Sequence, residues 1–423
     1  MRIAIVTWSR RKVGGTETYL DSIIPKLIKA GHQVSFWHEV NEPIVREHIP
    51  LPEGSPSWCV AEIGESAALA GLRKWQPDVI YSHSLIDPSL EAKVIRIAPA
   101  VLFAHAYYGT CISGSKTFKT PVMTPCNRRF GWQCLMHYYP HRCGGLSPVS
   151  MVREYRRQAA RLELLSAYTT ILTHSAHMRD EYQKHGFEPE KVVNLSYYAH
   201  SGSEGVSLDG DRLAAEGLLV PPGEAVDKPE ARPPAHWRLL FLGRMDVLKG
   251  GHLLIEALPR VAAALNRPVC VTFAGDGPKR EDWQRRAERA KAGHPGLSIE
   301  FVGWVTGALR ESLWDDCDLL VVPSVWPEPF GLVGPEAGLH SVPVVAYSVG
   351  GISEWLKDGF NGYLASGSPP SAVGLAEAIV KALCDPMTHR RMCLGAKTMA
   401  QKFNLENHLV GLLNVLNKAA QTT

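Results

Sequence analysis

Short apolar runs alternate with amphipathic stretches along most of the chain. Residues 3–7 form an apolar run typical of a buried parallel strand, and apolar positions from Tyr19 to Ile28 recur at helical spacing. Gly31 ends this predicted helix, and residues 34–37 form the next strand-like run. A strand, a helix and a second strand in this order predict the beginning of a Rossmann-like domain.

The same alternation continues in two parts. Further strands are predicted at residues 79–81, 101–104, 192–195, 238–242, 269–274, 299–302, 319–322 and 342–347, and within 169–175. Residues 200–236 are rich in Gly, Pro, Ser, Asp and Glu, as in a linker. We therefore predict an α/β protein with a Rossmann-like domain at 1–199, a linker at 200–236, a second Rossmann-like domain at 237–386, and C-terminal helices at 387–423 that cross back to the first domain.

Composition narrows the class of protein. A chain of 423 residues is long enough for two or three domains, and a net charge of +3 does not favour nucleic acid as a partner. No apolar run reaches the ~18 residues of a membrane span. No signal-peptide pattern precedes the first strand, so we expect a cytoplasmic protein. Nine cysteines in so long a chain do not predict a disulfide framework.

Residues 107–161 interrupt the α/β pattern. They contain Cys111, Cys126, Cys134 and Cys143. Their spacing contains no C-x-x-C pair, so we expect no metal, although a zinc site remains an alternative to a loop with buried thiols. Between residues 111 and 161 there are nine Lys or Arg residues and one acid, Glu154, with aromatic residues interleaved. This segment is interpreted as an acceptor site, as a surface for anionic lipid headgroups, or as a solvated insertion.

Two features of the first part carry candidate chemistry. The basic triplet at 10–12 precedes Gly14 and Gly15, which indicates an anionic ligand near a tight turn or a solvated charge run. The spacing is not G-x-G-x-x-G, so it does not predict a dinucleotide site. His105 directly follows a predicted strand. A single histidine is more often structural than catalytic, but the carboxyl end of a parallel strand is where a ligand site forms.

The stretch at 323–336 has the strongest pattern in the chain. It follows the apolar run 319–322, and its prolines and glycines force a loop before a helix that Pro335 can begin. Free N–H groups at such a turn suit a phosphate. Glu328 and Glu336 stand eight positions apart, and because carboxylates repel phosphate, we expect them to accept hydrogen bonds from hydroxyls. A sugar joined to a nucleotide through pyrophosphate fits this combination.

A second loop carries cations. Arg244 and Lys249 lie five positions apart between Gly243 and the glycine pair at 250–251. They can converge on a diphosphate, or they are surface charges at the start of a helix. Gly275 follows the next predicted strand. Glycines and charges at the carboxyl ends of several successive strands are typical of the ligand site of an open α/β sheet.

Together these residues resemble the retaining GT-B glycosyltransferases of family 4, over nearly the whole chain. The E-x7-E motif of that family is matched by Glu328 and Glu336. Its Gly-Arg…Lys-Gly element is matched by Gly243, Arg244, Lys249 and Gly250, its Gly-Gly-x-Glu loop by Gly14, Gly15 and Glu17, and its Gly-x-Gly-Pro turn by residues 275–278. Many relatives have His-Asp or His-Gly where this chain has His105-Ala106.

The resemblance implies a role for each matched residue. Arg244 and Lys249 would bind the donor diphosphate, Glu328 sugar hydroxyls, Glu336 the ribose, and His105 the donor sugar. Backbone at Gly14, Gly15, Gly243, Gly275, Phe330, Gly331 and Leu332 would hold the donor. The family requires no metal or other cofactor, and a UDP-sugar is the favoured donor. The acceptor would be a glycan or lipid-linked glycan.

The implied reaction is transfer of a hexose with retention of configuration, in cell-surface polysaccharide or glycoconjugate synthesis. Contact with the inner face of an anionic membrane would follow if the basic insertion binds lipid. A nucleotide-sugar epimerase or a phosphorylase on the same fold is an alternative, although no lysine environment demands the pyridoxal phosphate that a phosphorylase carries. A non-catalytic nucleotide-sugar-binding protein is a further alternative.

Overall fold

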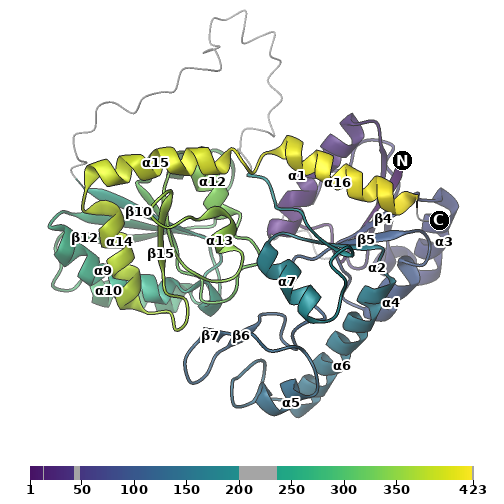
Figure 1. Cartoon of the computed structure of the whole chain (residues 1–423), viewed down its shortest axis with the longest axis horizontal. Coiled ribbons are helices and arrows are strands. Elements are labelled where there is room, and N and C mark those ends of the chain that lie inside the picture. The colour runs from purple at the N-terminus through teal and green to yellow at the C-terminus, as the bar shows by residue number, and fades with distance from the viewer. Residues whose placement is uncertain (13, 42–47, 200–235, 422–423) are drawn as a thin grey trace, which may run out of the picture.

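The computed structural model describes residues 1–12, 14–41, 48–199 and 236–421 (Figure 1). Two separate parallel sheets dominate it. The first has the order β3-β2-β1-β4-β5-β8-β9, and the second has the order β12-β11-β10-β13-β14-β15. The predicted pair of parallel α/β units is therefore confirmed. Apart from His236, the predicted linker at 200–236 lies outside the described residues.

The first sheet is built from short, largely buried apolar runs. Its strands are β1 (Arg2–Thr7), β2 (Gln33–His38), β3 (Ser57–Cys59), β4 (Val79–Ser82), β5 (Ala100–Phe103), β8 (Thr170–Thr173) and β9 (Val192–Asn194), paired in parallel throughout. Its helices are α1 (Gly15–Lys29), α2 (Val60–Ile63), α3 (Glu65–Trp75), α4 (Pro88–Val94), α6 (Pro148–Leu164) and α7 (Ala176–Lys184), with a 3-10 turn at Leu165–Ala167. Burial on both faces explains why these strands are continuously apolar.

The second sheet repeats this architecture. Its strands are β10 (Trp237–Leu242), β11 (Val269–Ala274), β12 (Leu297–Gly303), β13 (Leu319–Val322), β14 (Val344–Tyr347) and β15 (Gly362–Ala365), all parallel. Its helices are α9 (Gly251–Leu265), α10 (Arg280–Lys291), α11 (Gly307–Asp315), α12 (Val333–Leu339), α13 (Ile352–Trp355) and α14 (Ala372–Leu383), with a 3-10 turn at Val247–Lys249.

The order of strands places a ligand site in each unit. In the first sheet β1 lies between β2 and β4, and in the second sheet β10 lies between β11 and β13. The chain therefore changes direction across the sheet at β1/β4 and at β10/β13. Ligands of open α/β sheets bind beyond the carboxyl ends of the strands at such a switch point. The glycine loops after β1 and β10, and the long loop after β13, all begin there.

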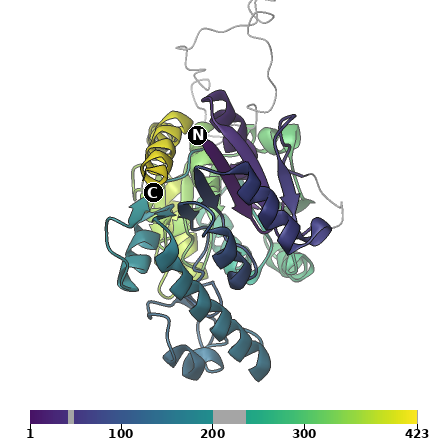
Figure 2. The same cartoon turned by 90° about the vertical axis from the view of Figure 1, so that its right-hand side faces the viewer.

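The insertion projects from the first unit. It contains β6 (Thr117–Phe118) paired antiparallel with β7 (Thr124–Pro125), and α5 (Gln133–Tyr138), before α6 returns to the sheet. Both cartoons show this segment extending away from the two sheets (Figures 1 and 2). The predicted break in the α/β pattern at 107–161 is thus a separate small substructure.

Two C-terminal helices connect the units. Helix α15 (Pro386–Ala400) packs on the second unit, and α16 (Leu405–Ala420) lies over the first, as the yellow helices in Figure 1 show. The ring of His408 in α16 lies within hydrogen-bond distance of the Tyr19 hydroxyl, Nε2 to Oη 2.9 Å. The predicted crossing back of the C-terminal helices is confirmed. Within the described ranges, no helix is long and apolar enough to cross a lipid bilayer.

Candidate active site at the carboxyl ends of the two sheets

The structure brings Lys249 and Glu328 together. Lys249 Nζ lies 2.5 Å from Glu328 Oε1, although the residues are 79 positions apart. Ser324 Oγ donates to the same oxygen at 2.6 Å. Glu328 is 4% exposed, so its charge requires a partner close by. This ion pair, in which Glu328 is buried and Lys249 is 31% exposed, lies between the loops that follow β10 and β13.

Close backbone contact fixes the relative positions of these two loops. Asp246 accepts hydrogen bonds from Leu248 N and Lys249 N and so caps the 3-10 turn that carries the lysine. Gly250 has φ +68°, and a Cβ there would lie 1.8 Å from Pro323 O. Only glycine allows this approach, which places Lys249 directly beside the loop at 323–332 that follows β13, the motif loop.

Arg244 does not join this ion pair. Its side chain is 70% exposed, and its Nε lies 3.6 Å from Asp246 Oδ2. The structure therefore separates the two cations that the sequence places in this loop. Lys249 is held at the carboxylate, whereas Arg244 lies at the open surface of the site.

Glu336 also has a cationic partner, which the sequence did not indicate. The carboxylate is 4% exposed, and its Oε2 lies 2.5 Å from an amino nitrogen of Arg310 in α11. Burial raises the pKa of Glu336, and the Arg310 guanidinium opposes that rise. Helix α12 begins at Val333, two residues before the predicted start at Pro335.

Backbone and ring contacts make the loop between the two glutamates rigid. Trp355 Nε1 donates to Phe330 O at 2.7 Å, and Gly331 adopts φ +87° beside the same indole ring. Gly351 N donates to Glu328 O at 2.6 Å. A Cβ on Gly350 would lie 2.3 Å from Glu328 O, so the glycine pair after β14 packs directly against the backbone of the motif loop.

The first unit meets this loop across the cleft. A Cβ on Gly15 would lie 3.8 Å from Leu332 Cδ1, so the glycine turn after β1 faces the loop after β13. Glu17 Oε2 accepts from Gly14 N at 2.8 Å and closes that turn. Tyr107 Oη donates to Pro327 O at 2.8 Å. The residues predicted on the two units are therefore brought to one cleft.

Histidines gather at the carboxyl edge of the first sheet. Nδ1 of His83 lies 2.7 Å from Nε2 of His105, and Nδ1 of His105 lies 2.5 Å from Tyr197 Oη. Burial lowers the pKa of His105 to about 3, so its ring is neutral. Both ring nitrogens of His105 lie within hydrogen-bond distance of other residues of the protein. One of these bonds would have to open before His105 could contact a donor sugar as predicted. Tyr197 packs edge-on against Phe330, with ring centroids 5.8 Å apart.

The histidines beside His105 were not predicted as site residues. His83 and His174 each stand directly after a strand, at the ends of β4 and β8. That position was the signal that could have identified them. Nε2 of His83 and both ring nitrogens of His174 are buried without a hydrogen-bond partner among the described residues.

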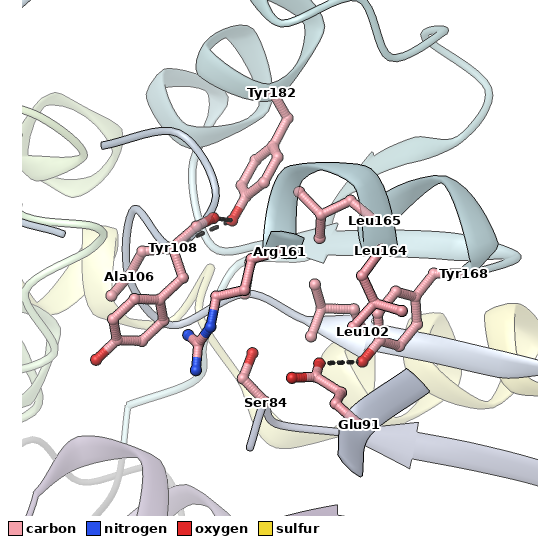
Figure 3. Close-up of a pocket in the computed structure, with 11 residues that line it drawn as sticks. Ser84, Glu91, Leu102, Ala106, Tyr108, Arg161, Leu164, Leu165, Tyr168 and Tyr182 are labelled. Atoms are coloured by element: carbon pink, nitrogen blue, oxygen red, sulfur yellow. Dashed lines mark hydrogen bonds between the residues drawn. The ribbon is translucent and has the colours of Figure 1, made fainter. Parts of the chain in front are cut away.

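A small polar pocket lies on the other side of β5 (Figure 3). The Arg161 guanidinium lies 4.7 Å from the centroid of the Tyr108 ring, and the Tyr168 hydroxyl donates to Glu91. Ser84, at the pocket edge, has φ +67°. The pocket adds an arginine, a carboxylate and three tyrosines (Tyr108, Tyr168 and Tyr182) to the first unit, none of which was predicted as a site residue.

The four cysteines of the insertion are free thiols. Burial raises the pKa of Cys126 and Cys134 and brings that of Cys143 to about 12, so these thiols are protonated at neutral pH. Among the residues that the structure describes, no group of three or more His, Cys, Asp or Glu side chains is placed to hold a metal ion.

Comparison with known proteins agrees with this geometry. Residues 13–193 match the family model described as Glycosyltransferase Family 4, and residues 236–385 match the model described as Glycosyl transferases group 1. An uncharacterized glycosyltransferase of Methanocaldococcus jannaschii is 24% identical over 88% of this chain and 87% of its own length. The glycogen synthase of Mycobacterium tuberculosis is 26% identical over 94% of this chain and 89% of its own length.

Solved structures extend the likeness to the whole fold. HepE of Anabaena, in complex with UDP and glucose, is 19% identical with a TM-score of 0.64, over 99% of this chain and all of that one. WaaG, a glycosyltransferase involved in lipopolysaccharide biosynthesis, is 17% identical with a TM-score of 0.62, over 98% of this chain and 99% of that one. The chain belongs to the GT-B glycosyltransferases.

Proposed function

We propose that the protein is a retaining family 4 enzyme that transfers a hexose from a nucleotide-diphosphate sugar to a glycan or lipid-linked acceptor. The observation that carries this proposal is the ion pair between Lys249 and the buried Glu328, whose loop also meets the first unit where Leu332 lies against Gly15. A cation and a hydroxyl acceptor beside a glycine turn suit a sugar diphosphate. HepE, which shares the fold, has been solved with UDP-glucose, and this makes a UDP-sugar the favoured donor.

In this proposal the departing diphosphate is stabilised by fixed charges. Lys249 is preorganised by Glu328, and Arg244 can swing from the open surface onto the phosphates. Cations held in a water-poor cleft lower the barrier by several kcal/mol, judged from comparable groups in other enzymes. Glu328 and Glu336 recognise hydroxyls, and His105 lies at the first-unit wall. The acceptor attacks from the face that the phosphate leaves, and the phosphate takes the acceptor proton.

Because Arg244 and Lys249 supply the positive charge, the proposed reaction requires no metal ion. Turnover is therefore expected to be unchanged when divalent metals are removed with EDTA. Loss of turnover that added Mg²⁺ or Mn²⁺ restores would contradict this part of the proposal.

The donor can be identified by thermal shift. UDP, GDP, ADP and their common sugars should be compared, because a ligand that binds only the folded state raises the unfolding midpoint. We expect one nucleotide series to stabilise the protein, with the sugar nucleotide at least as effective as the diphosphate. Stabilisation by none of these nucleotides would contradict the proposal. NMR of the product anomeric proton would then distinguish retention from inversion.

The alternative activities predict different products. An epimerase converts one sugar nucleotide into another without releasing the diphosphate, and a phosphorylase requires inorganic phosphate. A non-catalytic binding protein would be stabilised by the nucleotide but leave it intact. Release of a nucleoside diphosphate together with a glycosylated acceptor distinguishes the transferase from all three.

The insertion supports a lipid-linked acceptor. Trp132, Leu146 and Val149 are 63%, 78% and 76% exposed, and Met136 is also exposed. Exposed arginines accompany them in the same segment: Arg128, Arg129, Arg142, Arg153 and Arg156. Apolar anchors among basic side chains are typical of surfaces that bind anionic membranes. We therefore propose that the protein works at the inner face of a membrane, in cell-surface polysaccharide or glycoconjugate synthesis.

Vesicle co-sedimentation tests this surface. Binding to vesicles of phosphatidylcholine with phosphatidylglycerol is expected, and Trp132→Glu should weaken it while Leu394→Glu, at an exposed apolar position in α15, should not. Binding should also fall with salt, since the arginines act by charge. Equal sedimentation of wild type and Trp132→Glu, or no sedimentation at all, would contradict the proposal.

A further inference from the structure

Arg310 in α11 is the cationic partner of Glu336, the second glutamate of the motif. Its amino nitrogen lies 2.5 Å from Glu336 Oε2, and about a quarter of its side chain is exposed. Glu336 itself is almost fully buried. A buried carboxylate without a partner would be strongly destabilised, so the guanidinium determines whether this group stays ionised inside the protein.

The contact between Arg310 and Glu336 is one of several between α11 and the end of α12. Arg310 and Trp314 are one turn apart in α11, and Glu336 and His340 are one turn apart at the end of α12. The rings of Trp314 and His340 stack with an interplanar angle of 14° and centroids 5.6 Å apart. Glu311 also lies 3.5 Å from His340 Nε2. These contacts set the register of α11 on α12 and so hold Arg310 opposite Glu336.

The Glu336 carboxylate can accept further hydrogen bonds besides the one from Arg310. An ionised carboxylate offers about four lone pairs over two oxygens, and the contact with Arg310 engages Oε2. Glu336 lies four positions after Leu332, which faces the glycine turn of the first unit across the cleft. An acceptor of hydrogen bonds at this place suits neutral hydroxyl groups rather than phosphate.

We infer that Arg310 is a positioning residue that holds Glu336 charged and oriented to accept hydrogen bonds from the ribose hydroxyls of a nucleoside diphosphate. The inference rests on the proposed function and names the part of the donor that this ion pair would select. It predicts that the enzyme prefers ribose over 2′-deoxyribose, and that Arg310 is required for the preference although it makes no contact of its own with the sugar being transferred.

The test compares affinities for ribonucleotides and deoxyribonucleotides by calorimetry. UDP, GDP and ADP are titrated first, and the one that binds is compared with its 2′-deoxy form. Wild type should bind the ribonucleotide about tenfold more tightly or better, which is the usual effect of a hydrogen bond to a charged group. Arg310→Leu should bind both forms with the weak affinity of the deoxy form, and Arg310→Lys should recover part of the difference.

Two further variants separate positioning from folding. Arg390→Leu removes an exposed arginine of α15 and should leave the ratio unchanged. The double variant Arg310→Gln with Glu336→Gln leaves no unpaired buried charge and provides a folded protein if Arg310→Leu does not fold. It should also bind both nucleotide forms alike.

The outcomes distinguish the inference from the proposed function. If wild type binds none of the nucleotides, the proposed function fails. If wild type binds a nucleotide but shows no preference for ribose, or if Arg310→Leu or the double variant keeps the wild-type ratio, the inference fails and the proposed function stands. A lower unfolding midpoint with an unchanged ratio would make Arg310 purely structural and would likewise overturn the inference.

Discussion

At the scale of single residues, pairs formed across the fold determine the chemistry of the site. Lys249 and Glu328 could each be predicted, because a glycine-flanked cation and a motif carboxylate follow strands whose carboxyl ends meet. Their direct contact, with Ser324 as a third member, could not be predicted from spacing. Arg310 carries no local signal, since an arginine in an exposed helix is ordinary and only the packing of α11 on α12 gives it a partner.

Gly275 is predicted to be irreplaceable for a steric reason. Gly275 has φ +129°, and a Cβ there would lie 2.0 Å from Gly243 O. Gly275→Ala should therefore reduce the free energy of unfolding by roughly 1–3 kcal/mol from backbone strain alone, with the overlap in addition. Chemical denaturation measures this change.

Gly145→Ala is the matched control. Nothing lies within 4 Å of a Cβ at that position, so its effect should stay within about 0.5 kcal/mol. Equal stability of Gly275→Ala and wild type would contradict the contact between the loops after β10 and β11.

At the scale of elements, strands were easier to predict than the segments between them. Buried parallel strands such as β5 and β13 are continuous apolar runs, and both were predicted to within one residue. Strand β15 was missed because it begins with Gly362 and contains no Val or Ile to mark it as a strand. The register of α11 against α12 was also beyond the sequence, since helix packing depends on contacts between distant residues.

The histidines at the carboxyl edge of the first sheet, together with His408 in α16, predict a dependence of stability on pH. Burial lowers the pKa of His408 from 6.5 to about 4 and that of His105 to about 3, and the pKa values of His83 and His174 also fall well below 6.5. These four histidines therefore bind more protons in the unfolded chain than in the folded one below pH 6.5. The neutral rings make their full contribution to the free energy of unfolding above pH 6.5, and this contribution is lost as the pH falls towards 4.

Urea denaturation between pH 7.5 and 5 measures this effect. The free energy of unfolding should decrease by up to about 1.4 kcal/mol per pH unit for each buried histidine below pH 6.5. His408→Asn should reduce the slope, because it removes one of the titrating rings. A free energy that is constant from pH 7.5 to 5 would contradict the neutral histidine cluster.

At the scale of the whole molecule, contacts between the two units close the cleft. Besides the bond from Tyr107 to Pro327, Ser175 Oγ donates to Pro329 O at 2.6 Å, and Ala176 N donates to Glu354 Oε1 at 2.6 Å. The two-unit architecture was predictable from the repeated strand and helix pattern, but these contacts were not, since loop atoms meet across more than 150 positions. We propose that the units, divided at 1–199 and 237–386, open and close around the donor.

Turnover of the donor by Lys249→Ala tests the central claim most directly. Release of nucleoside diphosphate from the sugar nucleotide that stabilises the protein should be measured for wild type, Lys249→Ala and the surface control Arg390→Leu. In the proposed mechanism Lys249 stabilises the leaving charge, so Lys249→Ala should lower the rate about 100-fold or more while the protein stays folded, and Arg390→Leu should match wild type. A near-normal rate for folded Lys249→Ala would contradict the account.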